Sequence, residues 1–377
     1  MKNKLRLAIR ADASLMIGTG HIMRCFVIAS RLVREFNAEV MFIMREHQGN
    51  LIEFVQQKRA FSLAVLPAGE AGHDVRPPYN QWLGETEQRD IAQTLQALKQ
   101  FNPDWVLFDH YALGEKSHAA VKKEFGCGVA VLDDLADRAL HCDVLIDHNC
   151  ALDHSARYCG FIPEPAKTFF GPGYTPFRDE LLQAARKINK SHRSGDKKRI
   201  FVFLGGGDTY ASTKLVLLSL FSLPQFSELM VDVVVGMSCP NRDELESLCA
   251  AHVNVRYFCQ TPFLGELMAN ADLAIGTGGI NSSERVLLRL PSIAFALAEN
   301  QKPGLACYDT KDCVHYLGDF ADLSQAQLAA AIVKVLSEVN ELARMQLACA
   351  AMIPTPGEQD GLAEICQYLK DHNYENR

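Results

Sequence analysis

The stretch LRLAIRADASLMIGTGHIMRC, residues 5–25, decides the fold. An apolar strand over 5–10 runs into a glycine-containing loop, and a helical pattern follows the loop. The helix has one apolar face, formed by Ile22, Cys25, Phe26, Ala29, Leu32, Val33 and Phe36. The pattern places His21 at a helix N-terminus beyond the carboxyl end of a strand, where open α/β sheets bind their ligands.

His21 is the candidate catalytic residue of this loop. A helix N-terminus presents free N–H groups and partial positive charge, and a neutral imidazole placed there can accept a proton. The alternative interpretation is that His21 is an exposed histidine in a capping turn without a catalytic role, which is the more common case for a lone histidine. Asp12, Gly18, Gly20 and Arg24 surround it in the sequence, and they favour a functional loop.

Length and composition predict two domains. The chain has 377 residues, 48% of them hydrophobic, which is enough for two buried cores. The net charge of −7 is spread along the sequence, and the basic run 187–199 is typical of a linker rather than of a nucleic-acid groove. No N-terminal signal segment and no apolar stretch of ~20 residues is present. We expect a cytoplasmic monomer without nucleic-acid or membrane partners.

The 12 cysteines are scattered without a CxxC motif, which is typical of reduced cysteines in the cytoplasm. The densest group also contains histidines: His141, Cys142, His148, Cys150 and Cys159. This group lacks the paired short spacings of a structural zinc site. We expect neither a bound metal nor a cofactor.

Short apolar runs alternate with helical patterns, as in parallel βαβ units. The expected strands are residues 5–10, 39–44, 63–66, 104–110, 128–134, 143–149, 199–208, 231–236, 254–258, 272–279 and 292–297. The charged stretch 187–198 predicts a linker. The expected fold is α/β, with two Rossmann-like domains, 1–186 and 199–377, facing each other across a cleft. Helices after residue 325 can pack back across the linker.

Two glycine loops of the second half have nucleotide-binding features. In LGGGDT, residues 204–209, Gly205, Gly206 and Gly207 let a ligand approach the backbone closely. The loop is neither a GxGxxG motif nor a P-loop, which disfavours nicotinamide dinucleotides and ATP. A plain strand-to-helix turn is the alternative interpretation.

GTGGINSSE, residues 276–284, is the more specific loop. Its candidate binding residues are Gly279, Ser282, Ser283 and Glu284. Hydroxyls and free N–H groups suit a pyrophosphate, and a carboxylate accepts hydrogen bonds from ribose. An N-capped helix alone gives the same pattern. Asn300 and Gln301, after the next expected strand, favour the nucleotide interpretation.

In this order the motifs resemble those of the UDP-sugar hydrolases of pseudaminic acid biosynthesis, which act on UDP-2,4-diacetamido-2,4,6-trideoxy-β-L-altropyranose. The matching pieces are RADASLMIGTGHIMRC, YNQWLGETEQRD, DWVLFDHYAL, LDDLADR, LIDHN, GPGYTPFRDE, FLGGGD, MANADLAIGTGGINSSE and LPSIAFALAENQ. The chain departs from the family at Ser283, where Trp or Asn is common, and in the segment TPFRDE. These departures concern substrate specificity more than the class of reaction.

The resemblance implies the two-domain GT-B fold of MurG-type inverting glycosyltransferases. Carried onto this sequence, the essential histidine of the family is His21 and the tyrosine of its DHY motif is Tyr111. In the expected mechanism, Tyr111 and Asp12 orient the sugar amides, His21 or water. Asp109 and Asp133 are as well explained as structural acids at strand ends.

In the second domain the resemblance implies a UDP site. The contacts fall on the Gly205–Gly207 turn, on the backbone near Phe258 for the base, on Ser282 and Ser283 for the phosphates, and on Glu284 for the ribose. The implied reaction is metal-independent hydrolysis at the anomeric carbon, with His21 as the base that activates water. An inverting glycosyltransferase with a UDP-sugar donor is the main alternative, and an inactive nucleotide-sugar-binding subunit is the third.

Overall fold

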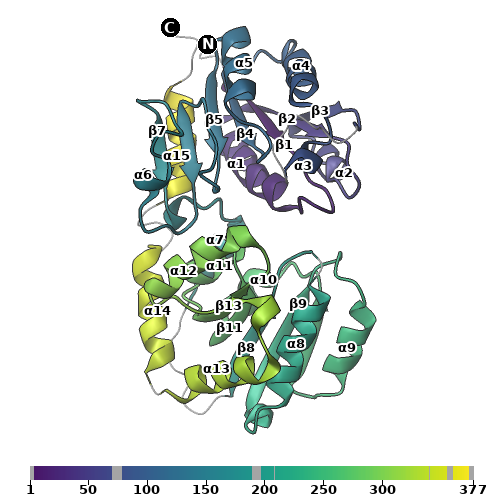
Figure 1. Cartoon of the computed structure of the whole chain (residues 1–377), viewed down its shortest axis with the longest axis vertical. Helices are drawn as coiled ribbons and strands as arrows, with labels where there is room; N and C mark the ends of the chain where they lie inside the picture. Colours follow the sequence, from purple (N-terminus) through teal and green to yellow (C-terminus); the bar gives the residue numbers. More distant parts are fainter. Residues whose placement is uncertain are drawn as a thin grey trace. The chain divides into compact units, whose positions relative to one another are not determined.

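The computed structural model describes residues 4–69, 79–188, 197–207, 209–338, 340–354 and 360–372. The chain forms two compact units, each built on a parallel β-sheet (Figure 1). Unit 1 comprises the described residues of 1–148, 153–176 and 360–372, and unit 2 those of 149–152 and 177–354. The predicted α/β class is confirmed, and the cleft between the domains stays a prediction.

The boundaries of the units differ from the predicted linker at 187–198, of which 189–196 lies outside the described residues. The predicted first domain included residues 177–186, but the structure assigns them to unit 2, because the helix over Asp179–Arg186 buries Leu181 in that core. The predicted second domain included 360–372, which belong to unit 1. A charged stretch in the sequence indicates only that the segment is exposed to solvent. The unit to which the flanking residues belong depends on the core in which their apolar side chains are buried.

Among the described residues, unit 1 contains a seven-stranded sheet in the order β3-β2-β1-β4-β5-β6-β7. Its strands are β1 (Arg6–Ala11), β2 (Glu39–Arg45), β3 (Phe61–Leu66), β4 (Trp105–Asp109), β5 (Gly128–Leu132), β6 (Val144–Asp147) and β7 (Lys167–Phe170). Its helices are α1 (Gly20–Phe36), α2 (Ile52–Gln56), α3 (Asn80–Leu83), α4 (Glu87–Leu98), α5 (Glu115–Phe125), α6 (His154–Arg157) and α15 (Gly361–Asp371).

Both faces of this sheet are covered, as parallel sheets require. Leu7 and Ile9 of β1 belong to the core that contains α1 and α15, whereas Ala8 belongs to the core on the other face, with α4 and α5. Helix α15 docks through a bidentate ion pair in which both Arg31 guanidinium nitrogens lie 2.7 Å from the Asp360 carboxylate. In Figure 1 this yellow helix lies among the purple-to-teal elements of unit 1.

Unit 2 contains a six-stranded sheet among its described residues, in the order β10-β9-β8-β11-β12-β13. Its strands are β8 (Lys198–Phe203), β9 (Leu229–Val235), β10 (Val255–Cys259), β11 (Leu273–Thr277), β12 (Ser292–Ala296) and β13 (Val314–Asp319). Its helices are α7 (Asp179–Arg186), α8 (Tyr210–Phe221), α9 (Arg242–Ala250), α10 (Leu264–Ala269), α11 (Ile280–Leu287), α12 (Lys302–Thr310), α13 (Gln325–Ser337) and α14 (Glu341–Met352). The helices expected after residue 325 are confirmed.

The strands β7 and β13 were not predicted from the sequence. Each lies at the edge of its sheet. An edge strand pairs on one side only and need not be a continuous apolar run. The sequences KTFF and VHYLGD are accordingly short or interrupted by polar residues.

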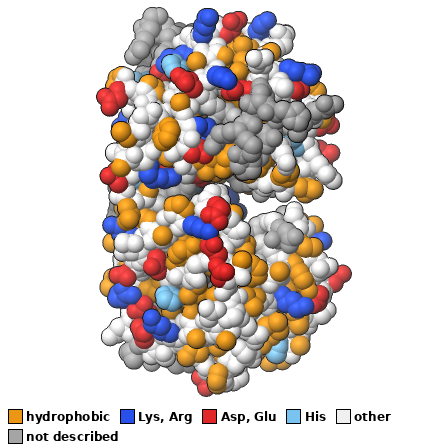
Figure 2. Space-filling view, viewed as in Figure 1, with side chains coloured by type: hydrophobic (Ala, Val, Ile, Leu, Met, Phe, Trp, Pro, Cys, Tyr) orange, Lys and Arg blue, Asp and Glu red, His pale blue; other side chains and the backbone are white. Residues whose placement is uncertain are grey.

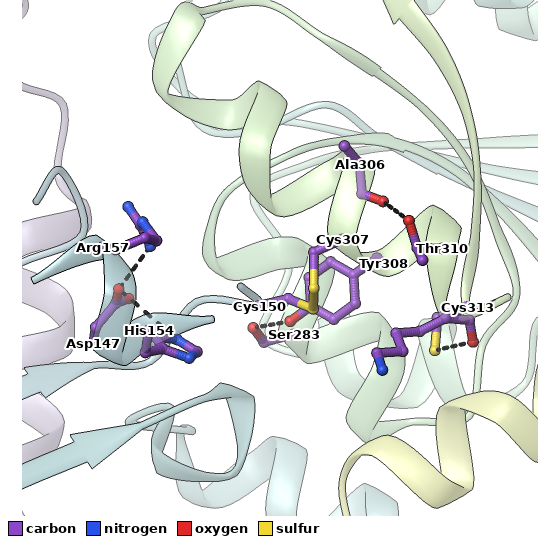
Figure 3. The surroundings of a disulfide bond; sticks show 11 residues. Asp147, Cys150, His154, Arg157, Ser283, Ala306, Cys307, Tyr308, Thr310 and Cys313 are labelled. Carbon is purple, nitrogen blue, oxygen red and sulfur yellow. Dashed lines mark hydrogen bonds and ion pairs between the residues drawn. A yellow bond between two sulfur atoms is a disulfide. The ribbon is translucent and has the colours of Figure 1, made fainter. Parts of the chain in front are cut away.

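A disulfide joins Cys150 to Cys307, which corrects the expectation that the cysteines are reduced (Figure 3). Their Cα atoms lie 5.7 Å apart although 157 residues separate them in the sequence. Sequence spacing carries no information about such a distant pairing. The bond ties the short segment 149–152 to α12 within unit 2.

Charged side chains of both signs are interspersed with apolar ones on the face shown in Figure 2. Across the described part of the chain, no helix has the length and apolar character that crossing a membrane demands.

Candidate functional site

The strand order of unit 1 places a topological switch point at the carboxyl ends of β1 and β4. β1 lies between β2 and β4, so the connections leave it in opposite directions, which is the switch point where doubly wound sheets bind ligands. Ala11 at the end of β1 is in register with Asp109 at the end of β4. The loop that follows β1 and the DHY segment are therefore neighbours, although about 90 residues separate them in the sequence.

The loop after β1 is held in shape by its own polar groups. The Ser14 hydroxyl accepts hydrogen bonds from the backbone N–H groups of Met16 and Ile17, at 3.1 and 3.0 Å. Gly18 adopts a left-handed φ of 76°, which a side chain would disfavour. Helix α1 begins at Gly20, so His21 lies in its first turn, as predicted.

His21 is fixed by a carboxylate and an arginine. Its Nδ1 lies 2.6 Å from Oδ1 of Asp109, and Arg24 Nε donates to the other carboxylate oxygen, also at 2.6 Å. Asp109 is completely buried, and His21 is 7% exposed. Burial alone would raise the pKa of Asp109, but the charges of Arg24 and His21 outweigh it and hold this pKa far below its usual range.

These contacts select one tautomer of His21. An ionised carboxylate offers only acceptors, so the proton in the 2.6 Å contact belongs to His21 Nδ1. Arg24 Nη2, 3.1 Å from the same nitrogen, is itself a donor and points to the shared Asp109 oxygen. In the neutral ring Nε2 therefore carries the lone pair. An imidazole oriented in this way by a carboxylate can accept a proton from water.

The buried polar side chains around His21 form a larger array, which also includes Tyr111, Asp134 and His148. The Tyr111 hydroxyl donates to Asp134. Burial is the main cause that raises the pKa of Tyr111 well above 10, and the charge of Asp134 raises it further. His148 Nε2 lies 3.2 Å from Arg24 Nη1, and because arginine only donates, this nitrogen is the acceptor. Burial is the main cause that lowers the pKa of His148 to about 4, and the positive charge of Arg24 contributes to the shift. His148 is thus a neutral imidazole at neutral pH.

Aromatic rings surround His21. The ring of Tyr111 meets it edge-on at a centroid distance of 4.8 Å, and Trp82 does so at 5.8 Å. Trp82 and Tyr111 stack on each other at 5.1 Å with an interplanar angle of 22°. Tyr111 therefore lies beside His21, and Trp82 is an additional neighbour; the orienting role of Tyr111 stays a prediction.

Asp12 has a different environment from the one predicted. It lies 2.8 Å from Arg10 Nη1, accepts a hydrogen bond from the Arg45 backbone N–H at 2.6 Å and lies 3.3 Å from His110 Nε2. Burial alone would raise the pKa of Asp12, but Arg10 outweighs it and the pKa is lowered. Among the contacts described for this part of the chain, none joins Asp12 to His21. Asp12 braces the end of β1 from within a buried ion network.

Unit 2 repeats the switch-point arrangement with β8 and β11. Thr277 at the end of β11 donates through its hydroxyl to the Leu204 carbonyl after β8, at 3.0 Å. Among the residues that the structure describes, a Cβ built on Gly205, Gly206 or Gly207 would meet no neighbour within 4 Å, so the turn is open on this side, as a ligand-contacting turn must be. Asp208, the last residue of the quoted GGGD motif, lies outside the described residues.

The serines of the second loop face inward. The Ser282 hydroxyl donates to the Thr277 carbonyl at 3.2 Å, and the Ser283 hydroxyl is 2.8 Å from the Tyr308 hydroxyl (Figure 3). Both serines are at most 2% exposed. Both hydroxyls are therefore engaged in internal contacts, and their role as phosphate ligands stays a prediction. The backbone at Gly279, with a φ of 85° and an open Cβ position, remains the group suited to an anion.

Glu284 has an unused hydrogen-bonding atom. Its Oε1 lies 3.3 Å from Arg178 Nη2, whereas Oε2 is buried and has no partner among the described residues. Burial raises the pKa of Glu284, because its effect is larger than that of the Arg178 charge, which lowers this pKa. A buried carboxylate oxygen without a donor is costly, and a ligand hydroxyl is one group that can supply the missing hydrogen bond.

The remaining predicted nucleotide residues lie on neighbouring loops. Phe258 is half-buried in β10, two strands from the switch point. A Cβ on Gly278 would fall 2.6 Å from Gln301 Cβ, so Gln301 lies against the second glycine loop, and its amide oxygen accepts from the Leu297 backbone N–H at 2.9 Å. Asn300 is exposed beside it.

Three residues were undervalued from the sequence alone. Asp109 was given a structural role as readily as a direct one, Trp82 was quoted only within a motif, and His148 was considered only as one of the polar residues at strand ends and as a possible zinc ligand. The DH pairs that end β4 and β6 were the available signal, because parallel strand ends meet at one edge of the sheet. In the described part of the chain, no group of three or more His, Cys, Asp or Glu side chains is arranged to hold a metal ion.

Comparison with solved structures identifies the class of fold. MurG of Acinetobacter baumannii superimposes with a TM-score of 0.67 at 12% identity, covering 98% of this chain and 100% of that one. HepE of Anabaena, solved in complex with UDP, superimposes with a TM-score of 0.59 at 12% identity, covering 98% and 99%. The chain therefore has the MurG-like GT-B fold. No family model matches it.

The sequence is also similar to that of a protein named as a UDP-sugar hydrolase. It is 24% identical over 298 residues to the UDP-2,4-diacetamido-2,4,6-trideoxy-β-L-altropyranose hydrolase of Campylobacter jejuni, covering 79% of this chain and 94% of that protein. The resemblance predicted from the motifs is thus confirmed as a sequence similarity along most of the chain.

Proposed function

We propose that the protein is a metal-independent hydrolase of a UDP-linked diacetamido-trideoxy sugar, acting in the biosynthesis of a nonulosonic acid of the pseudaminic type. The observation that carries the proposal is the His21–Asp109 pair at the switch point of unit 1, with Nδ1 bound to the carboxylate and Nε2 left as the proton acceptor. The similarity to the Campylobacter jejuni hydrolase supports the choice of substrate.

In this reaction His21 Nε2 takes a proton from water as the water oxygen attacks the anomeric carbon. The C–O bond to the pyrophosphate breaks, its electron pair leaves with UDP, and the anomeric configuration is inverted. The Asp109 carboxylate stabilises the imidazolium that forms, as a buried and ionised partner of Nδ1. A positioned base of this kind contributes about 10²–10⁴-fold to the rate.

Unit 2 supplies the nucleotide-binding groups in this proposal. The open Gly205–Gly207 turn and the backbone at Gly279, which begins α11, offer N–H groups to the pyrophosphate. The unpaired Oε2 of Glu284 accepts a ribose hydroxyl. The backbone near Phe258 contacts the base, and Gln301 closes the second loop. The N-terminus of α11 also stabilises the charge that develops on the leaving phosphate.

An inverting glycosyltransferase is the second candidate, because the solved structures that share the fold include MurG. The two activities differ in the molecule that His21 deprotonates, which is water in one case and an acceptor hydroxyl in the other. Release of UDP without an added acceptor separates them.

Hydrolysis in ¹⁸O-water with excess EDTA tests the proposed reaction. We expect UDP release at an undiminished rate, with the label in the sugar and none in UDP, because attack occurs at carbon. Mass spectrometry of both products gives the answer. Label in the UDP phosphate would mean P–O cleavage, a rate that EDTA abolishes and one divalent ion restores would show a metal enzyme, and release that requires an acceptor would favour the transferase.

Replacing Glu284 with alanine should weaken UDP binding by roughly tenfold to 100-fold, since a hydrogen bond to a charged acceptor contributes about 1.5–3 kcal/mol. Titration calorimetry on the full chain measures this. The matched control is Glu180→Ala, which removes the other carboxylate on Arg178, at 2.9 Å, and should change affinity less than about twofold. Equal affinities of wild type and a folded Glu284→Ala protein would remove Glu284 from the site.

A further inference from the structure

The aromatic cluster beside His21 is a feature that the proposed chemistry leaves unused. It consists of Tyr79, Trp82 and Tyr111, whose ring centroids lie between 5.1 and 5.4 Å from one another. Tyr111 is buried, at 3% exposure, whereas Tyr79 and Trp82 are only half-buried. The cluster thus extends from the buried catalytic array to the surface of unit 1.

Trp82 is held in place rather than left on a free surface. Its neighbour Leu83 is completely buried in the core on the α4 and α5 face of the sheet. Its ring stacks on Tyr111 and meets both Tyr79 and His21 edge-on. The Trp82 ring is large, apolar and half-exposed, and its centroid lies 5.8 Å from that of the His21 ring. Such a ring is suited to contact an apolar part of a sugar that reacts at His21.

We propose that Trp82, with Tyr79, forms a platform that binds the methyl-bearing edge of the sugar and so selects deoxy and N-acetylated sugars over fully hydroxylated ones. This inference rests on the proposed function, because it assumes that the reacting anomeric carbon lies near His21. A methyl group placed on the rings loses contact with water at no polar cost. A hydroxymethyl group in the same position would bury a hydroxyl against ring faces.

Substrate pairs provide the test. We compare kcat and KM for UDP-2,4-diacetamido-2,4,6-trideoxy-β-L-altropyranose and for its counterpart with a hydroxyl at C6. Wild type should favour the deoxy sugar by roughly tenfold to 100-fold in kcat/KM, the usual range for one small group in an apolar pocket. Trp82→Ala should bring this ratio to within about threefold of unity, mainly through KM, and Trp82→Phe should retain most of the preference.

The matched control is Phe54→Ala, which removes a half-buried aromatic ring of unit 1 that packs on Phe26 instead of on the catalytic array. It should leave the substrate ratio unchanged. If Trp82→Ala lowers kcat equally for both sugars, the ring only supports Tyr111 and the platform is refuted. An unchanged ratio in Trp82→Ala refutes it as well.

Fluorescence separates this proposal from the hydrolase proposal. The chain has two tryptophans, and Trp105 is buried, at 1% exposure, so the difference between wild type and Trp82→Phe isolates the Trp82 signal. The intact UDP-sugar should change this signal, and UDP alone should not. A sugar-specific change without hydrolysis would keep the platform and reject the hydrolase. Hydrolysis without such a change, at saturating substrate, would keep the hydrolase and reject the platform.

Discussion

Replacing His21 with asparagine should lower kcat by about 10²–10⁴-fold and leave the affinity for UDP unchanged. Asparagine can still hydrogen-bond to Asp109, so Arg24 keeps its partner and the fold is preserved. Its amide cannot accept a proton at neutral pH, so the variant loses the general base and the loss falls on kcat rather than on binding. Steady-state kinetics and UDP titration on the same preparation measure the two effects.

The control for this variant is His141→Asn. His141 is half-buried between β5 and β6, where its backbone N–H donates to His118 Nδ1 at 3.3 Å, and none of the contacts given for the described residues joins it to His21 or Asp109. The same substitution there should leave kcat within about twofold of wild type. A His21→Asn protein that retains kcat within about threefold would show that the histidine only shapes the loop, and the proposed mechanism would be wrong.

Replacing Asp109 with asparagine should have a comparably large effect, for a different reason. The amide introduced by Asp109→Asn can donate to His21 Nδ1, which moves the ring proton to Nε2 and removes the acceptor that faces water. We expect kcat to fall by roughly 10²–10⁴-fold. The substitution also removes the nearer of the two carboxylates that pair with the buried Arg24, the other being Asp134 at 3.7 Å, so the free energy of unfolding should fall by at most about 3–5 kcal/mol.

The pH dependence of stability gives an independent check. Because the pKa of Asp109 is lowered in the folded state, its stabilisation is complete above about pH 4, the unfolded value, and declines as the pH falls further. The difference in unfolding free energy between wild type and Asp109→Asn should therefore become smaller as the pH falls below about 4.

The control variant is Asp104→Asn, at the other end of β4. It removes a carboxylate that accepts a hydrogen bond from the Arg6 backbone N–H, and it should leave kcat unchanged. Normal kcat in Asp109→Asn would exclude the carboxylate as the orienting group.

The local features of the fold could be predicted because they depend on neighbours in the sequence. The start of α1 at Gly20, and with it the place of His21, follows from an apolar period and a glycine loop. The open turns at Gly205–Gly207 and Gly279 follow from glycines after buried strands. Periodicity also identified the interior strands, since these are nearly continuous apolar runs.

Long-range contacts could not be predicted from the same patterns. The bond between His21 and Asp109 depends on the register of β1 with β4, which no local period encodes. The inward hydroxyl of Ser283 depends on Tyr308, which lies 25 residues away. A serine at a helix start is a capping residue, a phosphate ligand or a packing residue according to what lies opposite it, and only the folded chain determines that.

The return of α15 to unit 1 has a consequence for the order in which the protein can fold during synthesis. Domains made first usually fold first. Here the α1 face of the unit 1 sheet lacks Leu362, Ile365 and Leu369 until all of unit 2 has been made. A nascent chain stopped before residue 360 therefore carries the loop with His21 on a sheet with an uncovered apolar surface. Helix α1, which contains His21, gains its complete packing only after α15 has been synthesised.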